Sequence, residues 1–193
     1  MSDANDPPVQ INEAAIAKGT RLLDEIKASG IFPGCAKLME KWFDLDLNIA
    51  LAGQFSRKCV QSACAVIGRL YSEPSDEVSR SIFEPSRYPL QNQGTVQTFL
   101  DSFTGHNTRW ETISLCFLML PRATWGLEKF EDLFANEHEK HWFRKKAIAL
   151  SDQCLEIALS LDTLNDLQFF VQYENFIAHS YADGDQSNHT FAV

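Results

Sequence analysis

Residues Phe99–Leu120 read FLDSFTGHNTRWETISLCFLML, and this stretch decides the fold. It leads from a turn rich in helix-starting residues into a nearly unbroken apolar run that stops before a proline. Asn107 or Thr108 is expected to cap the new helix, and Thr108 with Glu111 fits a capping box, in which both side chains bond orphan backbone N–H groups. Such an apolar helix belongs inside a domain, and about a dozen residues cannot cross a bilayer. The sequence therefore predicts a buried central helix at about 107–120.

Helical periodicity extends through most of the remaining chain. Apolar residues recur at three- and four-residue spacing, whereas the alternation and hairpin dipeptides typical of strands are scarce. Gly30 is expected to close the first helix, Pro33 to open the second and Gly184 to end the last. The sequence predicts an all-α fold, a single helical domain of roughly seven to nine helices around the central one. The expected helices span residues 11–30, 33–45, 54–71, 76–83, 95–103, 107–120, 127–134, 138–159 and 163–181.

Three expectations concern the C-terminal half. An irregular stretch with Trp125 and Gly126 should follow Pro121. Thr163 with Asp166 should cap the last helix. The packing face of the 138–159 helix should consist of Trp142, Ala147, Ile148, Leu150, Leu155 and Ile157. The last helix carries more apolar residues than one neighbour would cover, namely Leu164, Leu167, Phe169, Phe170, Val171, Phe176 and Ile177. Part of this surface is expected to stay exposed, so that the isolated chain self-associates or is only marginally stable.

Length and composition favour one packed domain. A chain of 193 residues with 45% hydrophobic residues and 14 phenylalanines can bury a substantial core. Pro7 and Pro8 disfavour an early helix, so residues 1–9 are expected to form a disordered N-terminus. The helical domain is assigned to residues 10–187, and residues 188–193 are expected to fray.

The charge balance argues against nucleic-acid binding. The net charge is −9 and the only basic cluster is Arg144-Lys145-Lys146, whereas phosphate binding needs clustered lysine and arginine. The N-terminus lacks the basic and apolar regions of a signal peptide, and no membrane association is expected. Five cysteines at irregular spacing predict free thiols in a reducing, intracellular compartment. The five are Cys35, Cys59, Cys64, Cys116 and Cys154, and most of them, with apolar neighbours in the sequence, are expected to be small buried hydrophobic residues.

Signatures of catalysis and metal binding are absent or incomplete. The chain has no GxSxG, P-loop or GxGxxG pattern, and nothing in the sequence supplies a partner for His106 or His179. We therefore predict no enzyme activity, no catalytic residue and no cofactor. A zinc site needs four convergent ligands, which neither the cysteine pair Cys59 and Cys64 nor the histidine pair His138 and His141 provides. The spacing of Asp183, Asp185 and Ser187 is similar to that of the first ligands in a calcium-binding loop. Asn188, however, occupies the position where that loop needs glycine.

Two blocks of sequence occur in an ordered pair. The first contains Phe103, Thr104, Gly105 and Asn107, then Arg109-Trp110-Glu111 before the hydrophobic run. The second opens with Leu161, Leu164, Asn165 and Asp166 and ends with Gly184, Asp185 and Ser187. In order and approximate spacing, this pair resembles the regulatory "middle homology" domain of fungal zinc-cluster transcription factors. Weaker similarity extends back to about Ile16, so that the resemblance covers most of the chain.

The resemblance implies a nuclear protein that takes part in transcription regulation through inhibition, effector response or partner contact. The chain lacks the family's six-cysteine zinc cluster and is truncated relative to the family on the C-terminal side, so direct DNA binding is not expected. The implied partners are proteins, either a second copy or a related transcription factor. Two alternatives stay open: a stand-alone protein that titrates an intact relative, and a sensor that holds a small-molecule effector between helices.

The motif residues Arg109, Trp110 and Glu111 have a structural and a functional interpretation. In the structural one, Trp110 packs in the core and Glu111 caps the central helix. Arg109 then pairs with a carboxylate or with backbone carbonyls at another helix end. In the functional one, the three residues contact a ligand or a partner. The structural interpretation is favoured, and the motif is then a folding device that joins two halves of the domain.

Overall fold

The structure is a computed structural model that describes residues 10–44, 53–90, 94–126, 133–161 and 165–190. Within these ranges it contains eight α-helices, one 3-10 helix and no strand, which confirms the all-α prediction. The helices are α1 (Glu13–Ser29), α2 (Phe32–Asp44), α3 (Gly53–Arg69), α4 (Ser75–Ser86), α5 (Val96–Asp101), η1 (Gly105–Asn107), α6 (Trp110–Gly126), α7 (Glu137–Leu159) and α8 (Asp166–Thr190). No helix in the described ranges is long and apolar enough to span a membrane.

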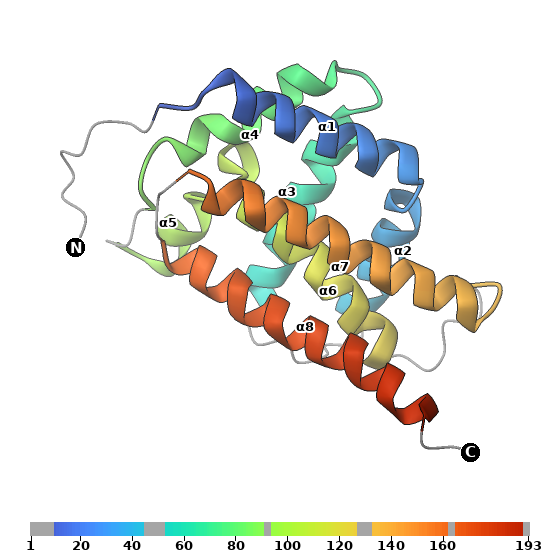
Figure 1. Cartoon of the computed structure of the whole chain (residues 1–193). Coiled ribbons are helices and arrows are strands. Elements are labelled where there is room, and N and C mark those ends of the chain that lie inside the picture. The colour runs from blue at the N-terminus through green and yellow to red at the C-terminus, as the bar shows by residue number, and fades with distance from the viewer. Residues whose placement is uncertain (1–9, 45–52, 91–93, 127–132, 162–164, 191–193) are drawn as a thin grey trace.

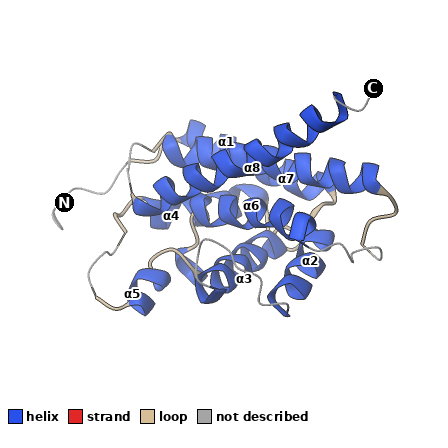
Figure 2. Cartoon of the chain, turned by 90° about the horizontal axis from the view of Figure 1, so that it is seen from below, coloured by secondary structure: helices blue, strands red, loops and turns tan. Residues whose placement is uncertain are grey.

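Helix α6 lies at the centre of the fold, as predicted. Every side chain from Thr108 to Pro121 is buried, because α6 packs against α7 and α8 on one side and α2 and α3 on the other. Figure 2 shows α6 between these two groups of helices. The apolar run needs neighbours on all sides, and the three-layer arrangement supplies them.

Helix α1 closes the domain by packing against helices from distant parts of the chain. Asn12 caps it, with its side-chain oxygen accepting from the Ala15 N–H at 2.7 Å, and Gly30 ends it with a φ of 64°. The helix lies across α4 and α7 (Figure 1). Its tie to α7 is polar as well as apolar, because Lys146 Nζ lies 2.6 Å from a carboxylate oxygen of Glu25.

Gly19 allows the closest approach between α1 and the core. A methyl group added there would lie 2.6 Å from both Ser79 Oγ and Trp110 Cζ2, and 3.0 Å from Phe83 Cε2. The ring of Trp110 is fully buried and meets Phe83 edge to face, with centroids 5.5 Å apart. The missing Cβ of Gly19 therefore makes room for the indole.

The predicted capping box at the start of α6 is wrong. Thr108 Oγ1 donates to the Gly105 carbonyl at 2.6 Å, and α6 begins at Trp110 with Arg109 in the cap position. Thr112 Oγ1 donates to the Phe103 carbonyl at 2.7 Å and accepts from the Arg109 N–H at 3.5 Å. Asn107 is no cap either, since its side-chain amide donates to the Asp101 carbonyl at 2.7 Å. These hydrogen bonds lie within the turn, and the Glu111 side chain instead contacts a distant part of the chain.

Two prolines expected to stop helices lie inside them. Helix α6 continues through Pro121 to Gly126, so the irregular stretch expected at Trp125 is helical instead, and α4 continues past Pro85 to Ser86. A proline removes one helical hydrogen bond, and in α6 this loss is offset by packing from several helices. Residues 127–132 of the helix expected at 127–134 lie outside the described ranges, and Leu133 and Phe134 are not helical.

The last two helices follow the prediction with three corrections. Trp142 on α7 was expected to pack inward but is 47% exposed. Helix α8 is capped by Asn165, whose side-chain oxygen accepts from the Gln168 N–H at 2.9 Å, while Thr163 and Leu164 lie outside the described residues. The helix also passes Gly184 and includes 188–190, because an interior glycine weakens a helix without ending it. The expected disordered segment 1–9 and residues 191–193 lie outside the described ranges as well.

Candidate functional site

The motif residues of the central turn contact other parts of the protein rather than a cavity. Gly105 has a φ of 64° and its N–H donates to Ser62 Oγ of α3 at 2.8 Å. Phe103 is buried and packs edge to face on Phe99, with centroids 5.2 Å apart. Both contacts fix the turn against the helices beside it.

Arg109 is buried at 3% exposure and reaches the C-terminal end of α4. Its terminal Nη2 donates to the Tyr88 carbonyl at 2.8 Å, two residues after α4 ends. Burial lowers the pKa of the guanidinium, and nearby Glu111 partly opposes this shift. This contact with a carbonyl beyond a helix end is of the kind that the structural interpretation predicts.

Glu111 and Asn165 bring the two sequence blocks together. Glu111 is 1% exposed, and its Oε1 accepts from the side-chain amide of Asn165 at 3.0 Å. The same amide side chain caps α8, so one residue joins the start of α6 to the start of α8. The remaining residues of the second block, Gly184, Asp185 and Ser187, lie near the other end of α8 (Figure 1). At 1.5 Å per residue, Gly184 is about 28 Å from Asn165 along the helix.

A polar cleft lies beside the turn. It has a volume of about 280 Å³ and is lined by Lys58, Gln61, Ser62, Asp101, Thr104, Gly105 and His106. Lys58 Nζ lies 3.4 Å from Asp101 Oδ1, so the cleft's lysine and aspartate offset each other's charge. Hydrogen bonding to Gln97, with a contribution from Lys58, lowers the pKa of Asp101 and keeps it ionised. The cleft is open and its charges are paired, so it lacks the apolar enclosure typical of a ligand site.

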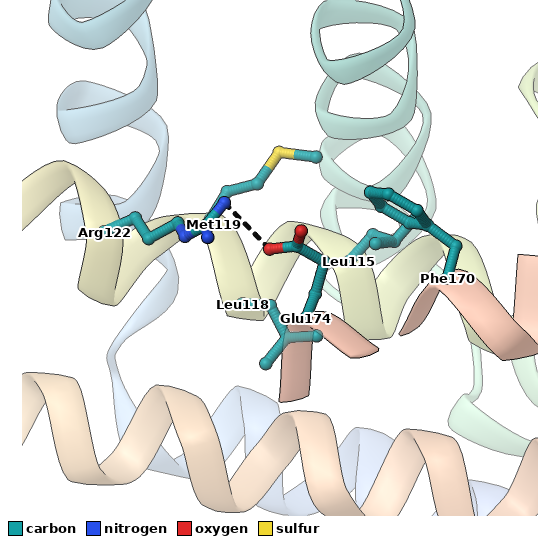
Figure 3. Close-up of a pocket in the computed structure, with 6 residues that line it drawn as sticks. All are labelled: Leu115, Leu118, Met119, Arg122, Phe170 and Glu174. Atoms are coloured by element: carbon teal, nitrogen blue, oxygen red, sulfur yellow. Dashed lines mark ion pairs between the residues drawn. The ribbon is translucent and has the colours of Figure 1, made fainter. Parts of the chain in front are cut away.

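A small apolar cavity with a buried ion pair lies between α6 and α8 (Figure 3). Arg122 Nη1 lies 2.8 Å from Glu174 Oε2, and the Glu174 side chain is only 5% exposed. The other carboxylate oxygen, Oε1, is buried without a hydrogen-bond partner in the described part of the chain. Burial raises the pKa of Glu174, and the charge of Arg122 opposes that shift. The cavity volume is about 10 Å³, enough for about one water molecule and too small for an organic effector.

His179 has a partner that sequence reasoning missed. Its Nε2 lies 3.0 Å from Asp152 Oδ1 on α7, and the same oxygen accepts from the Asn175 side-chain amide at 2.7 Å. His179 and Asp152 are 27 positions apart in the sequence, so their contact becomes visible only once α7 packs against α8. The cluster joins the two helices at the surface. His106 lines the polar cleft, and His138 and His141 lie on α7.

An exposed row of aromatic side chains runs along α8. It consists of Phe169, Tyr173, Phe176 and Tyr181, which are 68%, 58%, 72% and 57% exposed. At 3.6 residues per turn, Phe169, Tyr173 and Phe176 lie on one side of the helix, whereas Tyr181 is rotated toward the buried side. Leu167 and Val171 are buried, and α8 packs against α6 and α7. We call these four residues the α8 aromatic row. The expected exposure of part of the last helix is thus observed at Phe169 and Phe176, whereas Tyr173 and Tyr181 were missed. The helical spacing of Tyr173, four residues after Phe169, was a readable signal.

The α8 aromatic row exposes four large aromatic side chains on one helix. Surface aromatics that occur singly are ordinary, but exposed rings gathered on one side of a helix, as Phe169, Tyr173 and Phe176 are, are typical of an interaction surface. The groups of histidine, cysteine and acidic residues in the described ranges form no metal site. Comparisons of the chain with protein-family models, with curated proteins and with solved structures gave no match.

Proposed function

We propose that this chain is a protein-interaction module acting in transcription regulation, and that it pairs with a second copy through the α8 aromatic row. The exposure of that row carries the proposal. Aromatic side chains offer a large contact area and dominate interface energetics. The transcriptional role and a nuclear location rest on the resemblance to the fungal regulatory domain, in which Arg109, Trp110 and Glu111 mark the family and hold the fold.

A second copy fits the row because this part of α8 exposes no charged side chain. From Leu167 to Ala182 its exposed residues are Phe169, Gln172, Tyr173, Phe176, Ser180 and Tyr181, while the carboxylate of Glu174 is buried. Two chains with a net charge of −9 repel each other in general. Along this face they can approach without placing like charges opposite each other. In a two-fold symmetric dimer, the α8 aromatic row of one chain would pack against the same row of the second chain.

Sedimentation velocity of the purified chain is expected to show a concentration-dependent dimer. The double substitution Phe169→Ser and Phe176→Ser should shift it to monomer, because truncating an interface hot spot costs about 2 kcal/mol or more. Even one such loss weakens dimerisation roughly thirtyfold. Both rings are mostly exposed, so the fold should survive, which circular dichroism and thermal melting would verify.

Tyr71→Ser is the matched control for this test, since Tyr71 is 59% exposed in the turn that follows α3. It should leave the monomer–dimer equilibrium unchanged. A wild-type chain that stays monomeric to submillimolar concentration would contradict pairing with a second copy. In that case, co-precipitation of a related zinc-cluster protein that is lost with the Phe169 and Phe176 changes would favour the titrating alternative.

The chain is expected not to bind DNA. Two of the three residues of the basic cluster make contacts within the protein, because Arg144 donates to the Thr124 side chain at 2.7 Å and Lys146 pairs with Glu25 at 2.6 Å. Lys145 is exposed. A net charge of −9 opposes approach to phosphates. Fluorescence anisotropy with mixed-sequence duplexes at low and physiological salt should show no saturable binding. Salt-resistant, sequence-selective binding would overturn the interaction-module proposal in this form.

A small-molecule sensor is the less supported alternative. The apolar cavity between α6 and α8 holds about 10 Å³, and the larger cleft beside the turn is polar and open. An effector that raised the melting temperature of the wild-type chain would favour the sensor, because a ligand that binds only the native state stabilises it by mass action.

A further inference from the structure

Helix α8 lies along α6 and α7 (Figure 1) and buries polar as well as apolar side chains against them. Among residues 166–182, its buried side chains are as often polar as apolar: Leu167, Val171, Ala178, Gln168, Glu174 and Asn175. The residues that α1 buries are, by contrast, all aliphatic or glycine, namely Ile16, Gly19, Leu22, Leu23 and Ile26. The docking of α8 therefore depends on polar contacts to an extent that the docking of α1 does not.

Toward α7 these polar contacts lie about two helical turns apart. Gln168 Nε2 donates to the Ala158 carbonyl in the last turn of α7 at 3.1 Å, and both residues are buried. Asn175 Nδ2 donates to Asp152 Oδ1 at 2.7 Å. A hydrogen bond made on docking replaces one made to water, so its net contribution to stability is small. The two contacts therefore fix the position of α8 more than they strengthen its attachment.

Toward α6 the polar contacts involve two buried carboxylates that are incompletely bonded. Asn165 donates to Glu111 Oε1 at 3.0 Å, and Arg122 Nη1 lies 2.8 Å from Glu174 Oε2 (Figure 3). The second oxygens, Glu111 Oε2 and Glu174 Oε1, are buried without a hydrogen-bond partner in the described part of the chain. A buried acceptor without a partner costs free energy that hydration recovers. Because both carboxylates lie at the contact of α6 with α8, release of α8 lets water reach them.

We propose that α8 is a releasable helix, which leaves α6 and α7 while the other helices stay folded, and that only its docked form presents the α8 aromatic row to a second copy. The second part rests on the proposed function, since that pairing needs Phe169 and Phe176 held on one surface. Proteins open in cooperative units whose free energies lie between zero and that of global unfolding. The polar attachment of α8 places it in the lower part of this range. Helix α6, buried from Trp110 to Pro121, lies at the upper end.

Hydrogen–deuterium exchange of the wild-type chain, followed by mass spectrometry, tests release directly. The chain is measured at a concentration where sedimentation velocity shows only monomer, so that pairing does not enter. Amides of residues 170–178, away from the ends of α8, should exchange at least about tenfold faster than those of α6, both relative to their intrinsic rates. Equal protection of the two helices would overturn the proposal.

Two substitutions separate release of α8 from unfolding of the whole domain. Arg122→Ala removes a contact that is lost in both events, so protection should fall in α6 and in α8. Gly19→Ala strains α1 against Trp110, a contact that the released state keeps. It should therefore lower the protection of α6 and leave that of α8 unchanged. A parallel fall in both helices of Gly19→Ala would show that α8 opens only with the whole domain, and would overturn its separate release.

Exchange at rising chain concentration tests the link to pairing separately. If α8 pairs only when docked, its protection should rise over the range in which the dimer forms, because binding to the docked form stabilises that form by mass action. Phe169→Ser with Phe176→Ser should abolish this rise. Dimers that form without any rise would overturn the second part of the proposal. A chain that stays monomeric would overturn the proposed pairing and the second part with it, while fast exchange of α8 would still support its release.

Discussion

Arg122→Ala is expected to destabilise the chain by about 3 kcal/mol, the loss that follows when one member of a buried ion pair is removed. The substitution leaves the Glu174 carboxylate at 5% exposure with its charge partner gone, and its second oxygen has no hydrogen bond among the described residues. Removing the arginine also removes the influence that holds the pKa of Glu174 down, so the carboxyl should protonate at higher pH. Urea unfolding at neutral pH measures the loss.

The double variant Arg122→Met with Glu174→Leu separates the lost charge partner from lost packing. Well-packed apolar side chains often replace a buried ion pair without cost, and the cavity is lined by Leu115, Leu118, Met119 and Phe170. The double variant should therefore recover most of the stability lost in Arg122→Ala. The exposed pair of Arg80 with Glu13, at 50% and 75% exposure, gives a control in Arg80→Ala, which should change stability little. A harmless Arg122→Ala would show that the ion pair does not hold α8 to α6.

Gly19→Ala is expected to destabilise the chain by about 2 kcal/mol, although alanine is the better helix former. The new methyl group would lie 2.6 Å from Trp110 Cζ2 and from Ser79 Oγ. The serine is held in place, because it donates to the Ile16 carbonyl at 3.0 Å, and the fully buried indole has no free space to enter. Thermal melting should show a midpoint lower by roughly 4–8 °C.

Gly68→Ala supplies the matched control for the Gly19 substitution. Gly68 lies in α3, is exposed, and a methyl group there would meet no atom within 4 Å. Here only helix propensity acts, so the change should stabilise by roughly 0.5–1 kcal/mol. Opposite signs at the two glycines are expected. A stabilising Gly19→Ala would mean that α1 does not approach Trp110 as closely as described.

The helical class and the central helix could be predicted because both depend on local patterns. The apolar run after Trp110 has no exposed face, and the structure buries every residue from Thr108 to Pro121. Gly30 ends its helix as expected, since a left-handed backbone there favours glycine. The width of the apolar surface on the last helix likewise indicated that rings such as Phe176 would stay exposed.

What sequence reasoning missed depends on contacts between distant residues. The capping box at Thr108 fitted a local pattern, but Glu111 is taken by Asn165, 54 positions further along. Pro121 was expected to end the central helix, yet neighbouring helices hold that helix together as far as Gly126. The predictions from local sequence patterns were wrong where tertiary contacts determine the conformation.

The packing of α1 against α7 has a consequence for synthesis on the ribosome. Glu25 and Lys146 are 121 residues apart, and at 5–20 residues per second roughly 6–24 s separate the emergence of the two. During that interval α1 can pack against α4 but lacks its contacts with α7. Long-range closure of this kind also slows folding. A nascent chain paused before α7 would thus leave the α7-facing surface of α1 accessible to chaperones. Synthesis of α7 would then allow that surface to be buried.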